Sequence, residues 1–495
     1  MFPQIRILLT LLLFILLSGC AATYQPRTSI QQPEKELARQ IFQQINIPEL
    51  KTAVVGIMVQ SAETGEILFS HNANTLMMPA SNEKILTSAA ALLNLGPDFR
   101  YETKIFTNGS IDSGILKGDL IIIGSGDPSI SYRLCKKENP CLVFSPWADS
   151  LRGLGIEKIE GDIIGIDDIF DDQPIGYGWT VDNLPYSYAA EVGGLMYHEN
   201  FTTITIEADS AGDSINIAIS PEFEFLDIVS KVSIDSELTK LDFDRPPFSN
   251  KIIISGNISP GDKIRQRMSV HNPTLFFVSA LKRELINSGI EVSGDVLDGD
   301  DIDDAERLKP GTELFSHFSI PLEEILKILM KESQNLYAES LIKLLGHHFG
   351  EGGSFASGEK VLKRTLLRLG LEENYYGFKD GSGLSRYNYV SPAYLVKIFR
   401  RMHFHPLGDI YRDCLPIAGV DGTIGYRLKG TVAEGKIFAK TGTISNVRCL
   451  SGYAETADCE TLIFSTMFNN FLCSVQVVLD VQDQICMLLS SFSRN

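Results

Sequence analysis

The sequence lacks the marks of two large protein classes. No run of Lys or Arg occurs, and 44 Lys and Arg residues stand against 62 Asp and Glu residues, which gives a net charge of -18. Such a surplus of negative charge repels a polyphosphate backbone, so nucleic-acid binding is not expected. The apolar run Ile7 to Leu17 is too short for the roughly 20 residues of a membrane span. With 44% hydrophobic residues and a mean hydropathy near zero, a polytopic membrane protein is excluded.

Metal-binding motifs are also missing. There is no pair of Cys-x-x-Cys motifs and no His-Glu-x-x-His, and the eight histidines form only the close pairs His347-His348 and His403-Phe404-His405. A zinc site is therefore not expected. After Cys20, seven cysteines remain, so at least one lacks an intrachain partner. Cys135 and Cys141 are close in sequence, and both a small loop disulfide and two free thiols remain open there.

The N-terminus has the pattern of an export signal. Arg6 precedes the apolar run, which is followed by Leu17-Ser18-Gly19-Cys20. This order is typical of a secretory signal, and Leu-Ser-Gly-Cys resembles the bacterial lipobox, in which the peptide is cut before an acylated Cys. The alternative is a plain signal peptide with an incidental Cys. We predict a signal peptide over 1–19, lipidation of Cys20 and a tether over 20–34. The protein is then lipid-anchored in the bacterial envelope and faces the periplasm, and Ala21 resembles the signal for outer-membrane sorting.

The remaining chain changes its pattern twice. Helical and hairpin-like segments up to Gly96-Pro97 are followed by short β-branched runs, and helical periodicity returns at about residue 318. This order predicts an α/β (α+β) catalytic domain in two parts, 35–97 and 305–495, which a β-rich insert of one or two subdomains interrupts over 98–304. The segments expected to be regular are helices over 35–45, from Ser81 to Gly96, 322–330, 336–345, 361–369, 392–403 and 471–492, and strands over 52–60, 66–70, 448–454 and 461–468.

The first candidate catalytic motif is Ser81-Asn82-Glu83-Lys84. Because Ser81 and Lys84 are three positions apart at the start of an expected helix, the amine can reach the hydroxyl. The positive end of the helix dipole lowers the pKa of the lysine and favours an oxyanion nearby. The motif is weak alone, since the pairs Ser279/Lys282, Ser340/Lys343 and Ser357/Lys360 also match and are more simply interpreted as exposed helix faces.

Two further motifs follow in order. Ser333-Gln334-Asn335 lies between two apolar helical stretches, and Lys440-Thr441-Gly442-Thr443 begins a strand. A lysine at a strand edge, flanked by hydroxyls and by a glycine that allows close backbone approach, is suited to hold a carboxylate and a carbonyl. Each motif alone is common. The ordered triple with this context of helices and strands is not.

The triple resembles that of penicillin-binding proteins and active-site serine β-lactamases. With its long insert, the chain resembles the serine D-alanyl-D-alanine carboxypeptidase/endopeptidase family of the penicillin-binding protein 4 type, over nearly the whole mature chain. Gln334 departs from the family's usual Asp or Asn. Further matches are Gly118-Asp119-Leu120, Gly124-Ser125-Gly126-Asp127-Pro128-Ser129, Gly178-Trp179, Asn272-Pro273, 289–294 and Asp380-Gly381-Ser382-Gly383-Leu384-Ser385-Arg386.

The resemblance implies an acyl-enzyme mechanism in a transpeptidase fold like that of penicillin-binding proteins and serine β-lactamases, interrupted by the β-rich insert. Ser81 attacks a D-Ala-D-Ala or D-Ala-diaminopimelate bond, with Lys84 as general base. Ser333 relays a proton, Asn335 orders Lys84 and the substrate amide, and Lys440 holds the relay and attracts the terminal carboxylate. Thr441 and Thr443 supply hydroxyls, and the backbone N–H groups of Ser81 and Thr443 form the oxyanion hole. The expected partners are peptidoglycan peptides and β-lactams, and no metal or organic cofactor is required.

Two alternative functions remain. A serine β-lactamase needs a dedicated carboxylate base for rapid deacylation, a part that Glu83 cannot easily play, and has no use for so long an insert. A lipoprotein that binds peptidoglycan without catalysis is the other. Because the molecule is acidic, it must capture its acidic substrate through local cations, for which Lys84, Lys440 and Arg386 are placed. Asp171 or Asp172 is the expected partner for the amino group of diaminopimelate, the alternative being a solvated acidic turn.

Overall fold

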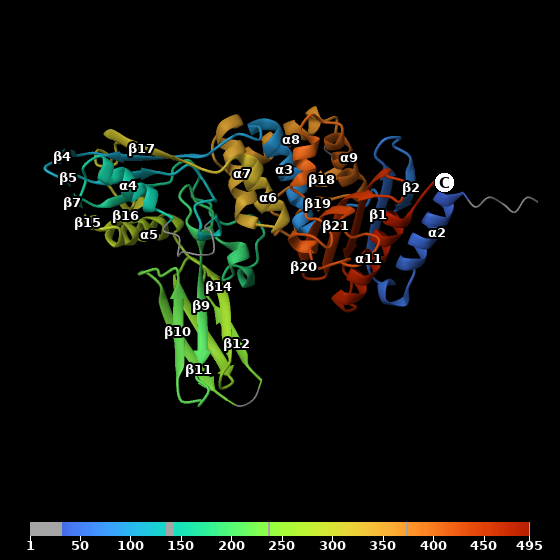
Figure 1. The fold of residues 1–495 in the computed structure, drawn as a ribbon, viewed down its shortest axis with the longest axis horizontal. Helices are drawn as coiled ribbons and strands as arrows, with labels where there is room; N and C mark the ends of the chain where they lie inside the picture. The colour runs from blue at the N-terminus through green and yellow to red at the C-terminus, as the bar shows by residue number, and fades with distance from the viewer. Residues whose placement is uncertain (1–31, 135–142, 236–237, 373–374, 495) are drawn as a thin grey trace, which may run out of the picture.

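A computed structural model describes residues 32–134, 143–235, 238–372 and 375–494 (Figure 1). The predicted signal peptide, Cys20, most of the tether, and the cysteines Cys135 and Cys141 lie outside the described residues. The lipidation of Cys20 therefore stays a prediction, and the pairing of Cys135 with Cys141 stays open. Within the described residues, no helix has the length and apolar character needed to cross a membrane.

A five-stranded antiparallel sheet joins the two ends of the chain. Its order is β2-β1-β22-β21-β20, and β1 pairs with β22 from Val54 opposite Asn469 to Ser61 opposite Leu462. The N-terminal hairpin is thus completed by strands that follow it by almost 400 residues. The strands are β1 (Val54–Ser61), β2 (Ile67–His71), β20 (Ile437–Ile444), β21 (Val447–Glu455) and β22 (Thr461–Asn469).

Helices cover both faces of this sheet (Figure 1). On one face, α2 (Pro33–Ile45) and α11 (Val475–Ser491) share an apolar core with the strands. On the other face lies a helical layer with its own core, into which Leu326, Leu341 and Phe399 are fully buried. This layer consists of α3 (Lys84–Leu95), α6 (Leu322–Lys331), α7 (Asn335–Phe349), α8 (Phe355–Arg368), α9 (Pro392–His403) and the short α10 (Gly408–Asp413), with the small hairpin β18 (Tyr376–Gly377) and β19 (Tyr389–Val390).

The helix that was expected to begin at Ser81 begins three residues later. Residues Ala80–Glu83 form a 3-10 turn, and α3 starts at Lys84. Ala80 has a left-handed φ of 47°, which turns the chain sharply before the helix and places Ser81 at the rim of the helical layer. At its other end α3 stops as expected, because Gly96 adopts a φ of 80° and is followed by a proline.

None of the three alternative Ser-x-x-Lys pairs is a fully exposed helix face, because the serine is buried in each, and one pair is buried at both residues. Ser340 and Lys343 on α7 are both fully buried. Lys343 donates through Nζ to a carboxylate oxygen of Asp171 at 2.7 Å and to the backbone oxygen of Gln173 at 2.8 Å. The polar residues of this helix face therefore dock a loop of the insert against the catalytic domain. The sequence pattern had indicated a solvent-exposed face at this position.

The insert forms two units. The first contains a five-stranded sheet and a four-stranded sheet packed with two helices that the sequence pattern did not predict, α4 (Ser145–Gly153) and α5 (Pro273–Asn287). The five-stranded sheet has the spatial order β16 (Val296–Asp298), β8 (Ile163–Ile166), β6 (Leu120–Ile123), β3 (Glu102–Thr107), β17 (Thr312–Phe318). The four-stranded sheet has the order β15 (Glu291–Val292), β7 (Lys158–Ile159), β5 (Ile115–Lys117), β4 (Ser110–Asp112).

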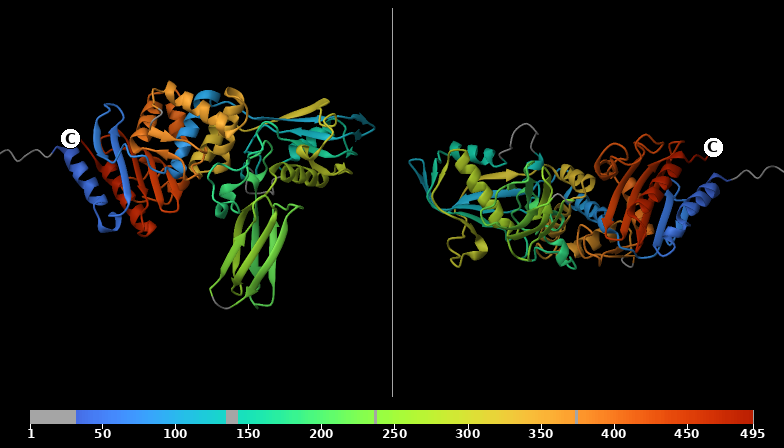
Figure 2. Two further views of the ribbon diagram at one scale, coloured as in Figure 1. Left: turned by 180° about the vertical axis from the view of Figure 1, so that it is seen from behind. Right: turned by 90° about the horizontal axis from the view of Figure 1, so that it is seen from below.

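The second unit is a β-sandwich that projects from the body of the molecule as an arm (Figures 1 and 2). Its two three-stranded sheets enclose a small core that includes Ile204, Ile252 and Met268. The strands alternate inward apolar and outward polar residues, as half-buried strands do. The sheets are β10 (Ile215–Ser220), β9 (Phe201–Ala208), β14 (Lys263–Ser269), and β11 (Asp227–Ile234), β13 (Lys251–Ile258), β12 (Lys240–Asp244).

Candidate active site

The first motif places a hydroxyl beside a buried amine. Lys84, at the first residue of α3, donates through Nζ to Ser81 Oγ at 2.9 Å, to Asn335 Oδ1 at 2.6 Å and to the backbone oxygen of Ser382 at 2.8 Å. The side chain of Lys84 is fully buried. The structure thus joins the first and second motifs through one amine, and it adds the carbonyl of Ser382, which sequence reasoning did not assign.

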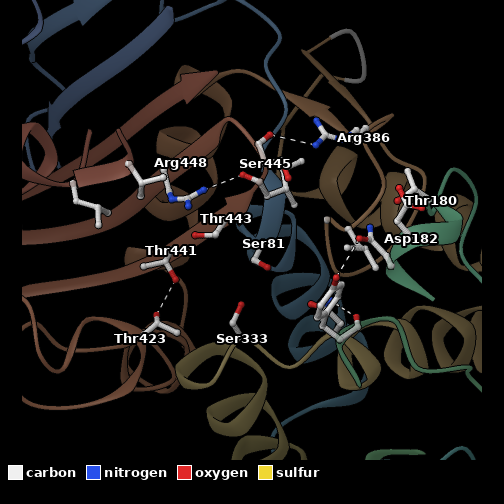
Figure 3. A pocket seen from close by; sticks show the side chains of 18 of the residues that line it. Ser81, Thr180, Asp182, Ser333, Arg386, Thr423, Thr441, Thr443, Ser445 and Arg448 are labelled. Atoms are coloured by element: carbon white, nitrogen blue, oxygen red, sulfur yellow. Dashed lines mark hydrogen bonds between the residues drawn. The ribbon is translucent and has the colours of Figure 1, made fainter. Parts of the chain in front are cut away.

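The third motif holds the serine of the second. Lys440 on β20 donates through Nζ to Ser333 Oγ at 2.8 Å and to the backbone oxygen of Thr441 at 2.9 Å. Ser333 has a left-handed φ of 61° between α6 and α7. Figure 3 shows the side chains of Ser81 and Ser333 facing each other across one space, with Thr441 and Thr443 of β20 beside them. The three motifs therefore form one site.

Burial changes the acid–base properties of both lysines. Removal from water lowers the pKa of Lys84 to about 7, against an opposing effect of the carboxyls of Glu339, Asp380 and Glu83. Burial, together with the charge of Lys84, also holds the pKa of Lys440 well below its ordinary value. A proton can therefore leave Lys84 near neutral pH, which is the condition for a general base.

Two glycines allow the catalytic turn to lie close to its neighbours. A Cβ on Gly442 would lie 2.4 Å from the backbone oxygen of Pro79, and a Cβ on Gly383 would lie 1.8 Å from that of Ala80. Gly383 also has a φ of 83°, which only glycine adopts without strain. Asn82 closes the contact by donating to the backbone oxygen of Lys440 at 2.8 Å. The Gly in the third motif thus has the close-approach role expected from the sequence.

The site opens into a pocket of about 1010 Å³ between the helical layer, β20 and the insert. Ser81, Ser333, Asn335, Thr441 and Thr443 line it, whereas Lys84, Lys440 and Gly442 are buried behind its wall. Figure 3 shows the insert segment that carries Thr180 and Asp182 on the side opposite Thr441. The insert therefore forms one wall of the pocket.

The pocket wall includes charged side chains that lie outside the three catalytic motifs. Asp182 is the carboxylate among its lining residues, and it comes from the insert. Arg386, as expected, also lines the pocket and donates to the backbone oxygen of Ser445 at 3.3 Å. Arg448 lines the wall near β20, and Arg427 is paired with Asp483 at 2.7 Å. Asp182 could have been found from the sequence, because it lies just after Gly178-Trp179, a segment that matches the resembled family.

The two acids expected to meet the substrate lie elsewhere. Asp171 is paired with Lys343, and both Asp171 and Asp172 line a separate cavity of about 150 Å³ within the insert. The prediction that one of them reaches the substrate is therefore wrong, because the chain turns between Asp172 and Gly178 and only the later segment reaches the pocket. Among the described residues, a carboxylate group with metal-ligand spacing occurs in that same cavity, formed by Asp167, Asp298 and Asp300.

Comparisons with known proteins identify the family of this chain. A profile of the D-Ala-D-Ala carboxypeptidase 3 (S13) family matches residues 37–492. The chain belongs to this family. The D-alanyl-D-alanine carboxypeptidase of Actinomadura sp. strain R39 is 30% identical over 476 residues, 92% of this chain and 85% of that protein. The D-alanyl-D-alanine carboxypeptidase DacB of Haemophilus influenzae is 26% identical over 449 residues, 87% of this chain and 89% of its own.

The fold of this S13 chain matches solved relatives. The crystal structure of penicillin-binding protein 4 from Haemophilus influenzae superposes with a TM-score of 0.76 at 26% identity, over 91% of this chain and 97% of that one. A complex of the same protein with a β-lactam gives a TM-score of 0.71 at 25% identity, with the same coverage. The predictions of the family, the mixed α/β fold and a serine-type peptidase are confirmed.

Proposed function

We propose that this protein is a penicillin-sensitive D-Ala-D-Ala carboxypeptidase/endopeptidase that cleaves peptidoglycan stem peptides through an acyl-enzyme on Ser81. The observation that carries the proposal is the pair of hydrogen bonds that joins Ser81 to Lys84 at 2.9 Å and Ser333 to Lys440 at 2.8 Å on one pocket. This arrangement holds a nucleophile, its base and a second hydroxyl on one reacting centre, within a chain of the S13 family.

Acylation begins at Ser81. Neutral Lys84 accepts the hydroxyl proton as Ser81 Oγ attacks the carbonyl of the penultimate D-Ala. The backbone N–H groups of Ser81 and Thr443 receive the developing oxyanion, which contributes about 3 to 4 kcal/mol for each donor. Asn335 holds Lys84 through its Oδ1 and is itself fixed by donation from Nδ2 to the backbone oxygen of Tyr188 at 2.6 Å.

The leaving amine then takes a proton through Ser333. Lys440 Nζ holds the hydroxyl of Ser333 at 2.8 Å. The proton that Lys84 took from Ser81 passes to Ser333 as Ser333 gives its own proton to the leaving nitrogen, so Lys84 is neutral again for deacylation. The C–N bond breaks, and the free D-Ala or diaminopimelate amine departs. Water next attacks the Ser81 ester with Lys84 again as base, which regenerates the enzyme.

Arg448 is placed to bind the carboxylate of the leaving residue. It lies directly across the β20–β21 ladder from Thr443, and neighbouring side chains on one face of such a pair stand about 5 Å apart. Its Nη1 donates to the backbone oxygens of Ile444 at 2.9 Å and Val447 at 2.7 Å, which fixes the guanidinium at the pocket wall. Arg448 therefore adds a local cation for an acidic substrate in a molecule with a net charge of -18.

Asp182 and Arg386 are placed to recognise the stem peptide. Both line the pocket, on the side away from Arg448 in Figure 3, and Asp182 is exposed. A carboxylate and a guanidinium together match a side chain that ends in an amino acid group, as diaminopimelate does. We assign to Asp182 the role that the sequence had given to Asp171 or Asp172.

The β-lactamase alternative receives no support from the pocket. Glu83 is fully buried and does not line it, and Asp182 belongs to the insert wall. Neither acid is placed as a dedicated base for the deacylating water, so a bound penicillin is expected to remain on Ser81. Slow release after a burst in a chromogenic cephalosporin assay is the expected result, and sustained turnover contradicts it.

We further propose that Cys20 carries lipid and anchors the enzyme in the bacterial envelope with its site toward the periplasm. The support is the sequence Leu17-Ser18-Gly19-Cys20 after an apolar run. Wild-type protein is expected in the detergent phase of a phase-partition experiment. A Cys20→Ser variant that remains in that phase overturns the lipidation.

Acylation by a labelled penicillin tests the nucleophile. Wild-type protein takes up one label per chain, and a Ser81→Ala variant takes up none. A Ser81→Ala variant that is labelled at the wild-type rate contradicts the proposal. Digestion of isolated muropeptides followed by mass analysis then separates loss of terminal D-Ala from cleavage of cross-links, and binding without product supports the non-catalytic alternative.

A further inference from the structure

Two residues of the insert hold the chain on both sides of Ser333. Arg133, in the turn Tyr132–Leu134, donates through Nη1 to the carboxylate of Glu332. Its Nε and Nη2 donate to Glu199, the Nη2 bond at 3.0 Å. Glu199 also accepts from Nε2 of Gln334. The residues immediately before and after Ser333 are therefore tied to one Arg–Glu pair.

The pair is rigid on the side of the insert. Glu199 is 3% exposed and has a φ of 57°, between His198 at 50° and Asn200 at 53°. Three consecutive non-glycine residues in the left-handed region cost free energy, of the order of 1 kcal/mol or more each, and persist only where their surroundings fix them. Here Asn200 does so: its Nδ2 donates to the backbone oxygen of Glu191 at 2.8 Å, and its Oδ1 accepts from the N–H of Tyr197 at 3.1 Å.

Ser333 itself needs such support. Its φ of 61° is unfavourable for serine, yet this conformation brings Oγ to 2.8 Å from Lys440 Nζ. We propose that Arg133 and Glu199 are positioning residues, which hold Ser333 in its left-handed conformation by fixing Glu332 and Gln334. The proposal rests on the role of Ser333 in the proposed function. It also explains the glutamine at position 334, whose longer side chain reaches Glu199.

The alternative is that the hydrogen bonds of Arg133 and Glu199 to Glu332 and Gln334 only dock the insert on the catalytic domain. The salt bridge between Lys343 and Asp171 at 2.7 Å is a contact of that kind, because it joins the same two parts but does not involve a neighbour of Ser333. Asp171→Asn is therefore the matched control. It weakens the attachment of the insert and leaves Arg133, Glu199 and Gln334 intact.

The decisive experiment uses charge exchange. Gln334→Glu places a second carboxylate against Glu199, which removes the donor and adds repulsion. We expect acylation of Ser81 by labelled penicillin, and kcat for a D-Ala-D-Ala peptide, to fall by about 10-fold to 100-fold with KM little changed. The double variant Glu199→Gln/Gln334→Glu restores one donor facing one acceptor, and most of the lost rate returns. Gln334→Ala, which adds no charge, is expected to lie between.

Each result has one interpretation. Wild-type acylation in Gln334→Glu, or no recovery in the folded double variant, overturns the positioning role. An equal loss of kcat in Asp171→Asn also overturns it, since docking alone then accounts for the effect. Thermal melting of every variant confirms that folded protein is compared. If Ser81→Ala is still labelled, the proposed function fails instead, so the two failures are distinguishable.

Discussion

At the scale of the residue, the site depends on two lysines that are both fully removed from solvent. Lysine is rarely buried without a charged partner, and here Lys84 and Lys440 bond mainly to neutral oxygens. Burial lowers the pKa of both, and the charge of Lys84 adds to the lowering at Lys440. The carboxyls of Glu339, Asp380 and Glu83 lie close enough to oppose this effect on Lys84. The balance between burial and these carboxyls gives Lys84 a pKa of about 7, so about half of it is protonated at neutral pH.

The pH dependence of acylation follows from this balance. If neutral Lys84 is the base, as we propose, its pKa of about 7 makes the second-order rate of penicillin acylation fall as pH drops below about 7. The loss approaches tenfold for each further pH unit. Stopped assays with labelled penicillin from about pH 5 to about pH 9 check this. A rate that stays constant over the acidic half of that range contradicts the role of Lys84.

Asp182 gives a second prediction at this scale. Asp182→Asn removes the charge that faces a substrate ammonium, and a charge-assisted hydrogen bond is worth about 1.5 to 3 kcal/mol. We expect kcat/KM for a diaminopimelate stem peptide to fall by about 10-fold to 100-fold. The same peptide acetylated on its side-chain amine is the control and is expected to lose nothing. An equal loss on both peptides indicates general damage to the pocket.

At the scale of the element, the decisive contact is that of β20 with the turn that carries Ser81. Asn82 spans this contact: its Nδ2 bonds the backbone oxygen of Lys440, and its Oδ1 accepts from Ser451 Oγ at 2.7 Å. The turn Ala80–Glu83 is thereby held against the strand edge whose Thr443 N–H we propose as one oxyanion donor. The proposed oxyanion hole depends on this spacing.

Gly442→Ala tests the contact. The new Cβ would lie 2.4 Å from the backbone oxygen of Pro79, so the strand and the turn must separate. We expect a fall of at least about 100-fold in the acylation rate, with a lower melting temperature. Gly153→Ala at the end of α4 meets no atom within 4 Å and is the control, expected to leave acylation unchanged. Wild-type acylation in Gly442→Ala contradicts the close-approach argument.

Elements with strong local signals were predictable, and those set by distant contacts were not. The helix over 392–403 and the strands around 448–454 and 461–468 follow from periodicity and lie where expected. The start of α3 was misplaced because the left-handed Ala80 precedes it, and local sequence does not indicate that conformation. Helices α4 and α5 were missed because their patterns lie among short β-branched runs.

At the scale of the whole molecule, buried acids limit stability at high pH. Glu284 on α5 is 5% exposed, and burial raises its pKa to about 7. The folded protein therefore holds this proton more tightly than the unfolded chain does. Its contribution to stability is fully present below the ordinary glutamate pKa and is lost as pH rises through about 7.

Glu284→Gln tests this linkage, since glutamine keeps the shape and does not ionise. We expect the variant to melt at a higher temperature than the wild type at about pH 8, and the difference to shrink at about pH 4. Differential scanning calorimetry at both pH values measures it. The same difference at the two pH values contradicts the argument, because a group that does not titrate on unfolding has no such effect.

The sequence by itself determined the family, the reaction class and the residues of the three motifs, because Ser-x-x-Lys, Ser-x-Asn and Lys-Thr-Gly occur in a fixed order. The tertiary structure decided which charged residues stand around them. Asp182 and the Arg133–Glu199 pair reach the site from the insert, and Arg448 reaches it from β21, the strand paired with β20. The placement of the insert residues depends on how the insert packs against the catalytic domain, and that packing follows from buried surfaces that no local pattern encodes.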